Sequence, residues 1–216
     1  MDWQRARTPE KIEERKGAIL EAAKDLFSRE RYEDISFNGI AAEAGFTKSN
    51  VYRYFSSREE IFLLIYSELA AEWSNSMIQY YRSLKPGLGV EHFAEGTVKV
   101  TAQHKQFLDL SPLLFISLEK NSSPEQLLAF KELTVNVVTE HTAELQRLFP
   151  KITSENVYFF LRIFQTVAAS FWASAHPNKE LKKIYQKPEF ESIAPDFERE
   201  LKRAVLIVMS GILMEV

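Results

Sequence analysis

Residues 40–55 read IAAEAGFTKSNVYRYF, and this stretch holds two short helix signals around a tight turn. Ser36 can cap a first short helix that runs to Glu43, because a serine side chain accepts hydrogen bonds from the free amides at a helix start. The Ala-Gly-Phe that follows favours a turn, and Thr47 can cap a second short helix that ends near Tyr54. Two short helices around such a turn predict a helix-turn-helix.

Longer helices are predicted on both sides of this stretch. Apolar residues recur at helical spacing between Glu10 and Arg31. Ser57 and Glu60 have the spacing of a capping box, which opens a long helix that ends near Leu84. The first helix and the two short ones share an apolar set that can form one small core: Ile19, Ala22, Ala23, Leu26, Phe27, Ile40, Ala41, Val51 and Phe55.

The rest of the chain also reads as helices. No alternating apolar pattern with glycine-rich turns predicts strands, so the expected fold class is all-α. A three-helix helix-turn-helix domain, residues 1–56, is expected to join a larger helical domain, residues 57–216. Residues 176–195 hold three prolines and are expected to form a loop with some local helix. The further helices are predicted over 90–107, 112–119, 124–149, 154–175 and 196–214.

Composition narrows the classes of protein. The chain is 45% hydrophobic and contains no cysteine, which argues against disorder and excludes a disulfide framework or a thiolate metal site. The first residues are polar, and the longest apolar stretches, 163–175 and 204–214, are too short to span a membrane. A cytoplasmic location without membrane contact is therefore expected. The net charge is -3, so any nucleic-acid binding must come from locally concentrated positive charge.

The second short helix concentrates such charge. Val51 and Phe55 can turn inward, which leaves polar and basic neighbours outward. Residues 47–58 carry three cations and no acidic residue, and short polar groups such as Asn50 can hydrogen-bond to base edges. Tyrosine hydroxyls and the amides at helix starts can bind phosphates. The expected contacts to double-stranded operator DNA are Ser36, Thr47, Lys48, Ser49, Asn50, Tyr52, Arg53, Tyr54 and Arg58.

Residues 27–62 resemble the DNA-binding domain of the TetR family of bacterial regulators. The resemblance rests on the alanine-rich helix, the Ala-Gly turn, the Tyr-Arg-Tyr-Phe close and the Ser-Arg-Glu-Glu-Ile-Phe entry to the next helix. It implies a helical regulatory domain, dimerisation through the last two long helices and, commonly, a ligand that lowers DNA affinity. Arg31, Gly39 and Ser49 depart from the usual pattern, so the operator sequence cannot be carried over.

Two features near the N-terminus can also be explained without DNA binding. A helix-turn-helix pattern on its own can be a three-helix substructure whose outer charges are merely solvated. Arg5 and Arg7 could form an arm that follows phosphates, but a charged terminal tail is more often disordered. The several matching parts of the TetR pattern favour DNA binding for the helices, and the arm stays outside the expected site.

The helix predicted over 154–175 is apolar around most of its circumference. Such a helix needs burial on several sides, and we expect its own core and a second copy of the chain to provide it. The alternative is a central helix buried wholly within one subunit. A homodimer is therefore expected through residues 154–175 and 196–214. The apolar residues on the first of these helices are Val157, Phe160, Leu161, Ile163, Phe164, Val167, Ala168, Ala169, Phe171 and Trp172.

Aromatic residues in the larger domain could surround a small, largely apolar effector that lowers DNA affinity. Polar groups on an apolar helix need partners, which makes Gln165 informative. Aromatic side chains at helical spacing are more often simple core, which is the competing interpretation. The expected ligand-binding residues are Phe107, Phe115, Phe164, Gln165 and Trp172.

Other classes of protein compete with a DNA-binding regulator. An enzyme would need catalytic or metal-binding groups, but His92, His104, His141 and His176 form no recognised motif and fit ordinary surface or capping roles. We therefore expect no catalytic residue, no metal and no cofactor. A ligand-independent regulator, an activator and a purely structural helical protein stay open. Salt-sensitive, sequence-selective DNA binding separates regulators from the other classes.

Overall fold

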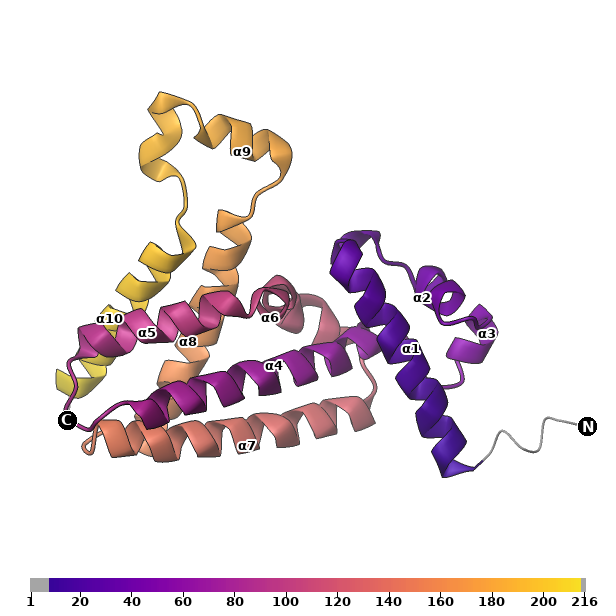
Figure 1. Cartoon of the computed structure of the whole chain (residues 1–216), viewed down its shortest axis with the longest axis horizontal. Helices are drawn as coiled ribbons and strands as arrows, with labels where there is room; N and C mark the ends of the chain where they lie inside the picture. The colour runs from indigo at the N-terminus through magenta and orange to yellow at the C-terminus, as the bar shows by residue number, and fades with distance from the viewer. Residues whose placement is uncertain (1–7, 215–216) are drawn as a thin grey trace, which may run out of the picture. The chain divides into compact units, whose positions relative to one another are not determined.

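The computed structural model describes residues 8–214, and every regular element in that range is a helix or a helical turn (Figure 1). The all-α fold class is thereby confirmed. Arg5 and Arg7, the candidate N-terminal arm, lie outside the described residues. None of the described helices combines the length and apolar character needed to cross a membrane.

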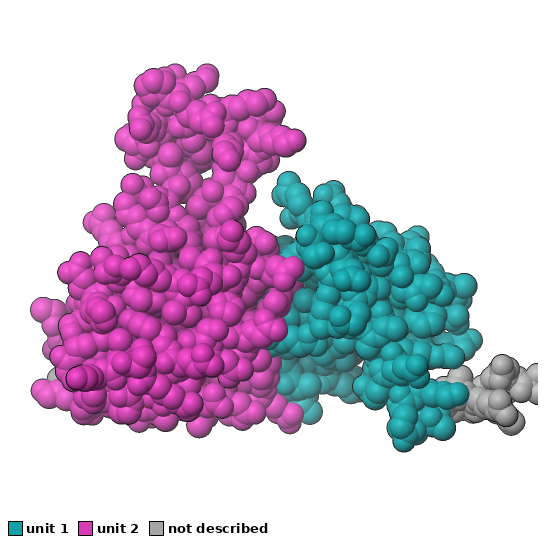
Figure 2. All heavy atoms as spheres, viewed as in Figure 1, with its two compact units in different colours: residues 1–68, 113–130 teal, residues 69–112, 131–216 magenta. Residues whose placement is uncertain are grey.

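The chain divides into two compact units, which Figure 2 draws in teal and magenta. Unit 1 contains residues 8–68 and 113–130, and unit 2 contains residues 69–112 and 131–214. The segment 113–130 therefore packs with the N-terminal helices, although it lies in the middle of the sequence. The division into two functional domains made from the sequence remains a prediction.

Unit 1 contains the helix-turn-helix. The short turn η2, Tyr32–Asp34, connects its first two helices. Helix α3 is shorter than predicted, because after Val51 the chain tightens into turns that include a hydrogen bond from the Tyr54 amide to the Val51 carbonyl at 2.9 Å. The helices of this part are α1 (Pro9–Arg29), α2 (Phe37–Glu43), α3 (Lys48–Val51) and the beginning of α4 (Arg58–Ser83).

Gly45 makes the turn between α2 and α3. Its φ of 70° lies in the left-handed region, which glycine adopts without a steric penalty. The Gly45 amide donates to the Ala42 carbonyl at 3.1 Å, and the Phe46 amide donates to the Ala41 carbonyl at 2.8 Å. These two bonds satisfy carbonyls at the end of α2. The predicted tight turn is confirmed.

The core of unit 1 is the predicted apolar set together with the start of α4. Phe62 meets Phe27 and Tyr32 edge to face, with ring centroids 5.6 and 4.8 Å apart. Aromatic pairs favour this geometry over face-to-face stacking. The predicted members are all buried: Ile19, Ala22, Ala23, Leu26, Phe27, Ile40, Ala41, Val51 and Phe55.

The helix predicted over 112–119 is wrong as a regular α-helix. Pro112 has no amide hydrogen and so cannot continue a helical ladder. The wide π-turn that follows buries Leu114 and Leu118 in place of an α-helical face. Three short elements replace the helix: η3 (Ser111–Leu113), η4 (Leu114–Leu118) and η5 (Glu119–Asn121).

Unit 2 contains the remaining helices. Helix α8 has the predicted bounds, but the single helix predicted over 90–107 is wrong. The backbone leaves helical geometry at His104, with φ -94° and ψ 61°, and the break allows a new helix to bury Phe107 and Leu108. The elements are the rest of α4, α5 (Val90–Gln103), α6 (Lys105–Leu110), the larger part of α7 (Pro124–Leu148), α8 (Ser154–Ala175), α9 (Lys179–Tyr185), η6 (Pro188–Ile193) and α10 (Phe197–Met214).

Candidate nucleic-acid interface and buried aromatic core

Side-chain caps fix the starts of α2 and α3. The Ser36 hydroxyl accepts from the Gly39 amide at 3.0 Å, and the Thr47 hydroxyl accepts from the Asn50 amide at 3.3 Å. Both hydroxyls keep a proton that can be donated outward, because capping uses them only as acceptors. Ser36 and Thr47 are exposed, so their role in the helix and a contact to a phosphate are compatible.

The outer face of α3 presents an ordered tyrosine. The Tyr52 side chain is 51% exposed, yet its ring stacks on Phe37 of α2 with centroids 4.5 Å apart. The Lys48 ammonium lies 5.7 Å from the centroid of the Tyr52 ring. Phe37 was missed from the sequence, although an aromatic residue at the first position of a short helix was an available signal. The stack orients the tyrosine at the surface.

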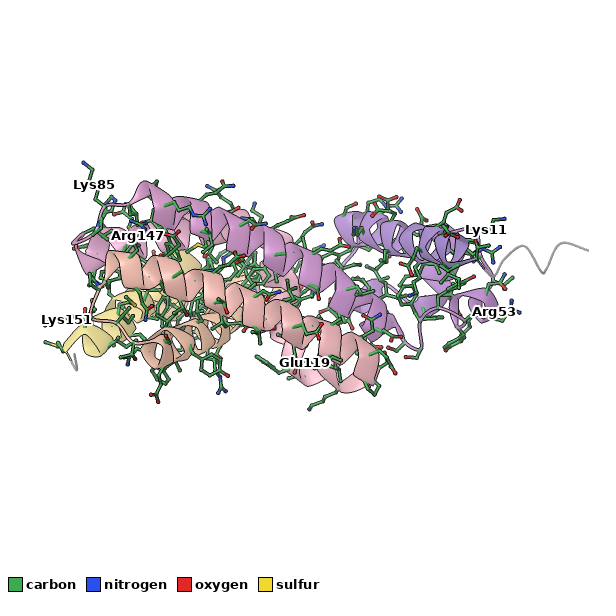
Figure 3. All side chains as sticks on the ribbon, turned by 90° about the horizontal axis from the view of Figure 1, so that it is seen from below. Lys11, Arg53, Lys85, Glu119, Arg147 and Lys151 are labelled. Atoms are coloured by element: carbon green, nitrogen blue, oxygen red, sulfur yellow. The ribbon has the colours of Figure 1, made fainter. Side chains whose placement is uncertain are left out.

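The other predicted residues of α3 lie around Tyr52. Ser49 and Arg53 are exposed and Asn50 is half-buried. The Ser49 hydroxyl lies 3.1 Å from that of Thr47, so the two form a hydroxyl pair at the helix start. Figure 3 shows the Arg53 side chain projecting from the ribbon. Polar, aromatic and cationic groups therefore share this exposed surface.

Tyr54 is less free than predicted. Its hydroxyl accepts a hydrogen bond from the Arg15 guanidinium of α1 at 3.2 Å, and the pair is partly buried. Arg15 was not singled out from the sequence, because its position on α1 gives no local sign of a partner 39 residues away. Arg15 thus adds a cation beside Tyr54, just after the end of α3.

Arg58 has several partners inside unit 1. Its guanidinium donates to the Ile35 carbonyl at 2.6 Å, binds the Glu59 carboxylate at 3.0 Å and lies 4.2 Å from the Tyr32 ring centroid. A guanidinium with these partners holds α4 against the segment before α2. The structure therefore gives Arg58 a stabilising role inside unit 1, and its expected contact to the phosphate backbone stays a prediction.

The capping box at the start of α4 is only half formed. The Ser57 hydroxyl accepts from the Glu60 amide at 3.0 Å, but the Glu60 carboxylate binds Ser56 and the Ser123 hydroxyl instead of the Ser57 amide. Burial raises the pKa of Glu60, and the hydrogen bonds from Ser123 and Ser56 outweigh burial, so that the pKa lies below its usual value. This buried carboxylate links the start of α4 to the start of α7 within unit 1.

The five predicted ligand-binding residues do not form one group. Phe107 and Phe164 both stack on Trp73, with centroids 5.2 and 5.7 Å apart, in the core of unit 2. Trp172 is buried elsewhere and donates its indole N–H to Asp109 at 2.7 Å. Gln165 is half-buried.

Phe115 is a correction to the ligand list. It belongs to unit 1 and its side chain is 52% exposed, whereas Phe107 and Phe164 are buried in unit 2. The π-turn that buries Leu114 and Leu118 turns Phe115 outward. The sequence could not reveal this orientation, because the irregular turn changes which residues share a face.

Polar groups inside the aromatic core of unit 2 were missed from the sequence. The Trp73 indole donates to the Thr101 hydroxyl at 3.1 Å, and the Ser74 hydroxyl lies 3.0 Å from His141 Nε2. His141 is fully buried, so the surface or capping role expected for it is wrong. Burial lowers its pKa to about 4, and the imidazole is neutral at pH 7.

Helices α8 and α10 keep apolar surface in the single chain. Tyr158 and Phe159 of α8 and Ile207 of α10 are exposed. Helix α8 is therefore not buried on all sides within one subunit. The predicted apolar residues divide into a buried set, namely Val157, Phe160, Phe164, Ala168 and Trp172, and a half-buried set, namely Leu161, Ile163, Val167, Ala169 and Phe171.

Two sequence profiles of known families match most of the chain. One is described as the tetracyclin repressor-like C-terminal domain and matches residues 67–215. The other is described as bacterial regulatory proteins of the tetR family and matches residues 19–65. The second match contains the helix-turn-helix, and the first contains unit 2.

Several curated proteins are similar to part of this chain. HTH-type transcriptional regulator YfiR of Bacillus subtilis is 44% identical over 55 residues, which are 26% of this chain and 27% of that protein. HTH-type transcriptional regulator RutR of Escherichia coli is 24% identical over 95 residues, 44% of this chain and 45% of that protein. These matches span less than half of either relative.

Solved structures match over nearly the whole chain. A structure from Mesorhizobium loti described as a TetR-family transcriptional regulator has a TM-score of 0.58 at 15% identity and covers 94% of this chain and 97% of that one. The fatty acid degradation regulator FadR from Bacillus halodurans has a TM-score of 0.54 at 14% identity, with 92% and 96% covered. At such identities the likeness establishes a shared fold.

Proposed function

Because the chain belongs to the tetR family of bacterial regulatory proteins and is thus a DNA-binding transcriptional regulator, we propose that it is a homodimeric repressor that a small, largely apolar effector releases from its operator. The proposed DNA contacts rest on the side chains at the outer face of α3. There Lys48 and Arg53 accompany an ordered Tyr52 and the half-buried Asn50, with no acidic residue in the segment.

The contacts divide by their chemistry. Asn50 and Ser49 carry short hydrogen-bonding groups that suit base edges in the major groove. Lys48, Tyr52 and Arg53 suit phosphates or base edges, and the outward hydroxyls of Ser36 and Thr47 suit phosphates. Tyr54 contributes together with Arg15, whose guanidinium it binds. Arg58 is left out, because its guanidinium has partners inside unit 1.

A homodimer is supported by the apolar surface left on α8 and α10. Exposed Phe159 and Ile207 lie on the two helices that the sequence analysis assigned to the interface. A two-fold dimer uses the same patch on both copies. It also places two recognition helices on successive major grooves of one face of DNA, about 34–36 Å apart.

An effector would act by changing that separation. Helix α4 contains residues of both units, so a ligand in unit 2 can bias the position of the recognition helix through it. Only a ligand that binds the two states unequally can shift the equilibrium between them. The ligand and DNA must then weaken each other's binding by the same factor. A ligand-independent regulator lacks this reciprocity, and an activator keeps it while raising transcription.

The test of DNA binding uses the purified protein and DNA from the region upstream of its gene, titrated at several salt concentrations. Arg53→Ala is expected to weaken binding to every sequence and lower the salt slope by about 2, because the dimer loses one phosphate contact in each copy. Asn50→Ala is expected to cost about 1–3 kcal/mol on the operator and to relax one base preference. Lys151→Ala, an exposed cation of unit 2, is the matched control.

Two results would overturn parts of this proposal. Unchanged operator affinity in folded Arg53→Ala and Asn50→Ala would remove the α3 face from the interface. A reporter gene behind the same DNA that is expressed more strongly with the regulator than without it would favour an activator.

Arg58→Ala is expected to lower the stability of unit 1 while leaving the salt slope of the folded protein unchanged.

A further inference from the structure

The core of unit 2 contains a group of polar side chains that its packing does not explain. His141 of α7, Ser74 of α4 and Thr101 of α5 are buried to within 2% of full burial, in a core that is otherwise apolar. Buried polar groups lower stability unless their hydrogen bonds are made. Their presence therefore requires a structural or a binding purpose.

The hydrogen bonds of this group are nearly complete, with one exception. Thr101 accepts from the Trp73 indole and donates to the Thr97 carbonyl at 2.8 Å. His141 Nε2 pairs with the Ser74 hydroxyl. His141 Nδ1, however, is fully buried and has no hydrogen-bond partner among the residues that the structure describes.

Either tautomer of His141 leaves the same atom unpaired. If the Ser74 hydroxyl donates to Nε2, then Nδ1 carries the proton and lacks an acceptor. If Ser74 accepts from Nε2, then Nδ1 offers a lone pair and lacks a donor. A hydroxyl group can both donate and accept, so it would satisfy Nδ1 in both cases.

Flat rings pack on Trp73 beside His141. The rings of Phe107, Phe164 and His141 lie within 12°, 16° and 20° of the plane of Trp73, with centroids 5.2 to 5.7 Å from it. A flat ring inserted among these near-parallel rings would gain dispersion contacts with several of them. The rings come from α4, α6, α7 and α8, so a ligand among them would contact four helices.

The core also restricts the charge of a ligand. Among the described residues of unit 2, the buried polar side chains are serines, threonines and His141, and none is a carboxylate, ammonium or guanidinium. A charged ligand would be buried without a counterion, which is costly. Burial also keeps His141 neutral, so it cannot serve as the counterion at pH 7.

We propose that unit 2 binds an uncharged, planar aromatic molecule that carries a hydroxyl group, with the hydroxyl bonded to His141 Nδ1 and the ring stacked among Trp73, Phe107 and Phe164. This rests on the effector binding proposed above and specifies its chemistry. The ligand enters by separating these side chains, so that its bound conformation is a minor state of the free protein. Of the five ligand-binding residues predicted from the sequence, Phe107 and Phe164 belong to this site.

The probes that test this site are 2-naphthol and naphthalene, which share a ring system and differ in one hydroxyl. A purely apolar core would prefer naphthalene, because a hydroxyl buried without a partner loses its bonds to water. If the hydroxyl is hydrogen-bonded to His141 Nδ1, 2-naphthol binds more tightly than naphthalene. We expect 2-naphthol to bind the unmodified dimer about tenfold more tightly than naphthalene, a difference of about 1.4 kcal/mol. Tryptophan fluorescence and calorimetry measure both affinities.

Substitutions test whether His141 Nδ1 causes the preference for 2-naphthol. His141→Phe keeps an aromatic ring and removes the nitrogen, so 2-naphthol should lose about tenfold in affinity while naphthalene changes little. His92→Phe changes an exposed histidine of the same unit and should leave both affinities unchanged. If His141→Phe does not fold, the ¹⁵N resonance of His141 Nδ1 in the unmodified protein gives the answer. It should shift with 2-naphthol and stay in place with naphthalene.

The outcomes separate this inference from the proposed function, because operator binding is measured on the same preparation. Equal or stronger binding of naphthalene, binding of neither probe, or an unshifted Nδ1 resonance would overturn the site and leave operator binding untouched. A preference for 2-naphthol that depends on His141 supports the site. If saturating 2-naphthol then leaves operator affinity unchanged, the site stands and the release mechanism fails for this ligand.

Discussion

At the scale of single residues, Gly45 shows how one backbone angle makes the DNA-reading element. An alanine in its left-handed conformation costs roughly 1–2 kcal/mol, because Cβ approaches the following carbonyl oxygen. No neighbouring atom lies within 4 Å of an added Cβ, so the whole penalty comes from φ. We expect Gly45→Ala to lower the free energy of unfolding by about 1 kcal/mol, measured by urea titration at fixed protein concentration.

The matched control for this change is Gly17→Ala. Gly17 lies within α1, and an added Cβ there also meets no atom within 4 Å. Alanine is favoured over glycine in a helix by about 0.5–1 kcal/mol, so this variant should gain stability. The two substitutions should thus have opposite signs. Equal effects would contradict the role assigned to φ.

His141 should make stability depend on pH. Its pKa is about 4 in the folded protein because of burial, against 6.5 for an exposed histidine, so between these values the unfolded chain binds more protons. The free energy of unfolding therefore falls as the pH falls through this window. From about pH 7 to about pH 5 the loss from this residue is about 2 kcal/mol. Measuring the free energy of unfolding at both pH values in the wild type and in His141→Phe isolates the contribution of His141. Identical pH dependence in the two proteins would contradict the lowered pKa of His141.

The residues that the sequence could and could not assign differ in the range of their contacts. The caps Ser36 and Thr47 were predictable, because each binds an amide three residues away. Two carbonyl partners of Arg58 lie 23 and 26 residues away, and its role inside unit 1 was missed. The hydrogen-bond partner of His141, Ser74, lies 67 residues away, and no local pattern could indicate this pairing.

At the scale of helices, Gly96 allows α5 to approach α4 closely. An added Cβ would overlap the hydroxyl and ring of Tyr80, whose hydroxyl donates to the His92 carbonyl at 3.0 Å and the Phe93 carbonyl at 3.3 Å. Overpacking of this kind costs about 1–3 kcal/mol, more than alanine gains in a helix interior. We expect Gly96→Ala to destabilise the protein by about 1–2 kcal/mol in urea unfolding.

A double-variant cycle gives the control for this prediction. In a Tyr80→Leu background the overlapping ring is absent, so Gly96→Ala should lose most of its cost. The coupling between the two changes should be about 1 kcal/mol or more. Additive effects of the two substitutions would show that Tyr80 is not the source of the penalty.

Helix bounds were predictable where the signals are local. Helix α8 begins after Thr153, whose hydroxyl accepts from the Asn156 amide at 3.1 Å, and its predicted bounds are confirmed. The break at His104 and the π-turn over Leu114–Leu118 were not predictable. Both serve tertiary packing, since each brings leucine or phenylalanine side chains into a core that the rest of the chain forms.

At the scale of the whole molecule, the fold class and the family followed from the sequence, but the membership of the two units did not. Segment 113–130 belongs to unit 1, so Phe115 is in a different unit from the other residues chosen for the ligand site. Contacts between residues far apart in the sequence decide which segments belong to which unit, and helical periodicity does not predict these contacts. The proposed DNA-binding face lies within one short stretch of sequence, so local patterns were enough to propose its residues, and it stays a prediction.

The proposed dimer makes a prediction that joins assembly to DNA binding. Ile207 on α10 and Val135 on α7 are both 63% exposed in the single chain, which makes them a matched pair. A carboxylate at Ile207 would be placed twice in a two-fold interface, once in each copy, and buried without a partner. Ile207→Asp should therefore shift sedimentation at micromolar concentration from dimer to monomer, and Val135→Asp should leave the dimer intact.

The loss of the dimer should be visible on DNA. A monomer presents one recognition helix, so Ile207→Asp should engage one half-site and neutralise about half as many phosphates, which would halve the salt slope of operator binding. Affinity should fall by at least about tenfold, because the second half-site no longer binds intramolecularly. A monomeric Ile207→Asp with unchanged salt slope would refute operator binding as a dimer. A variant that stays dimeric would place the interface outside this face of α10, and the exposed Phe159 of α8 would then be the next position to change.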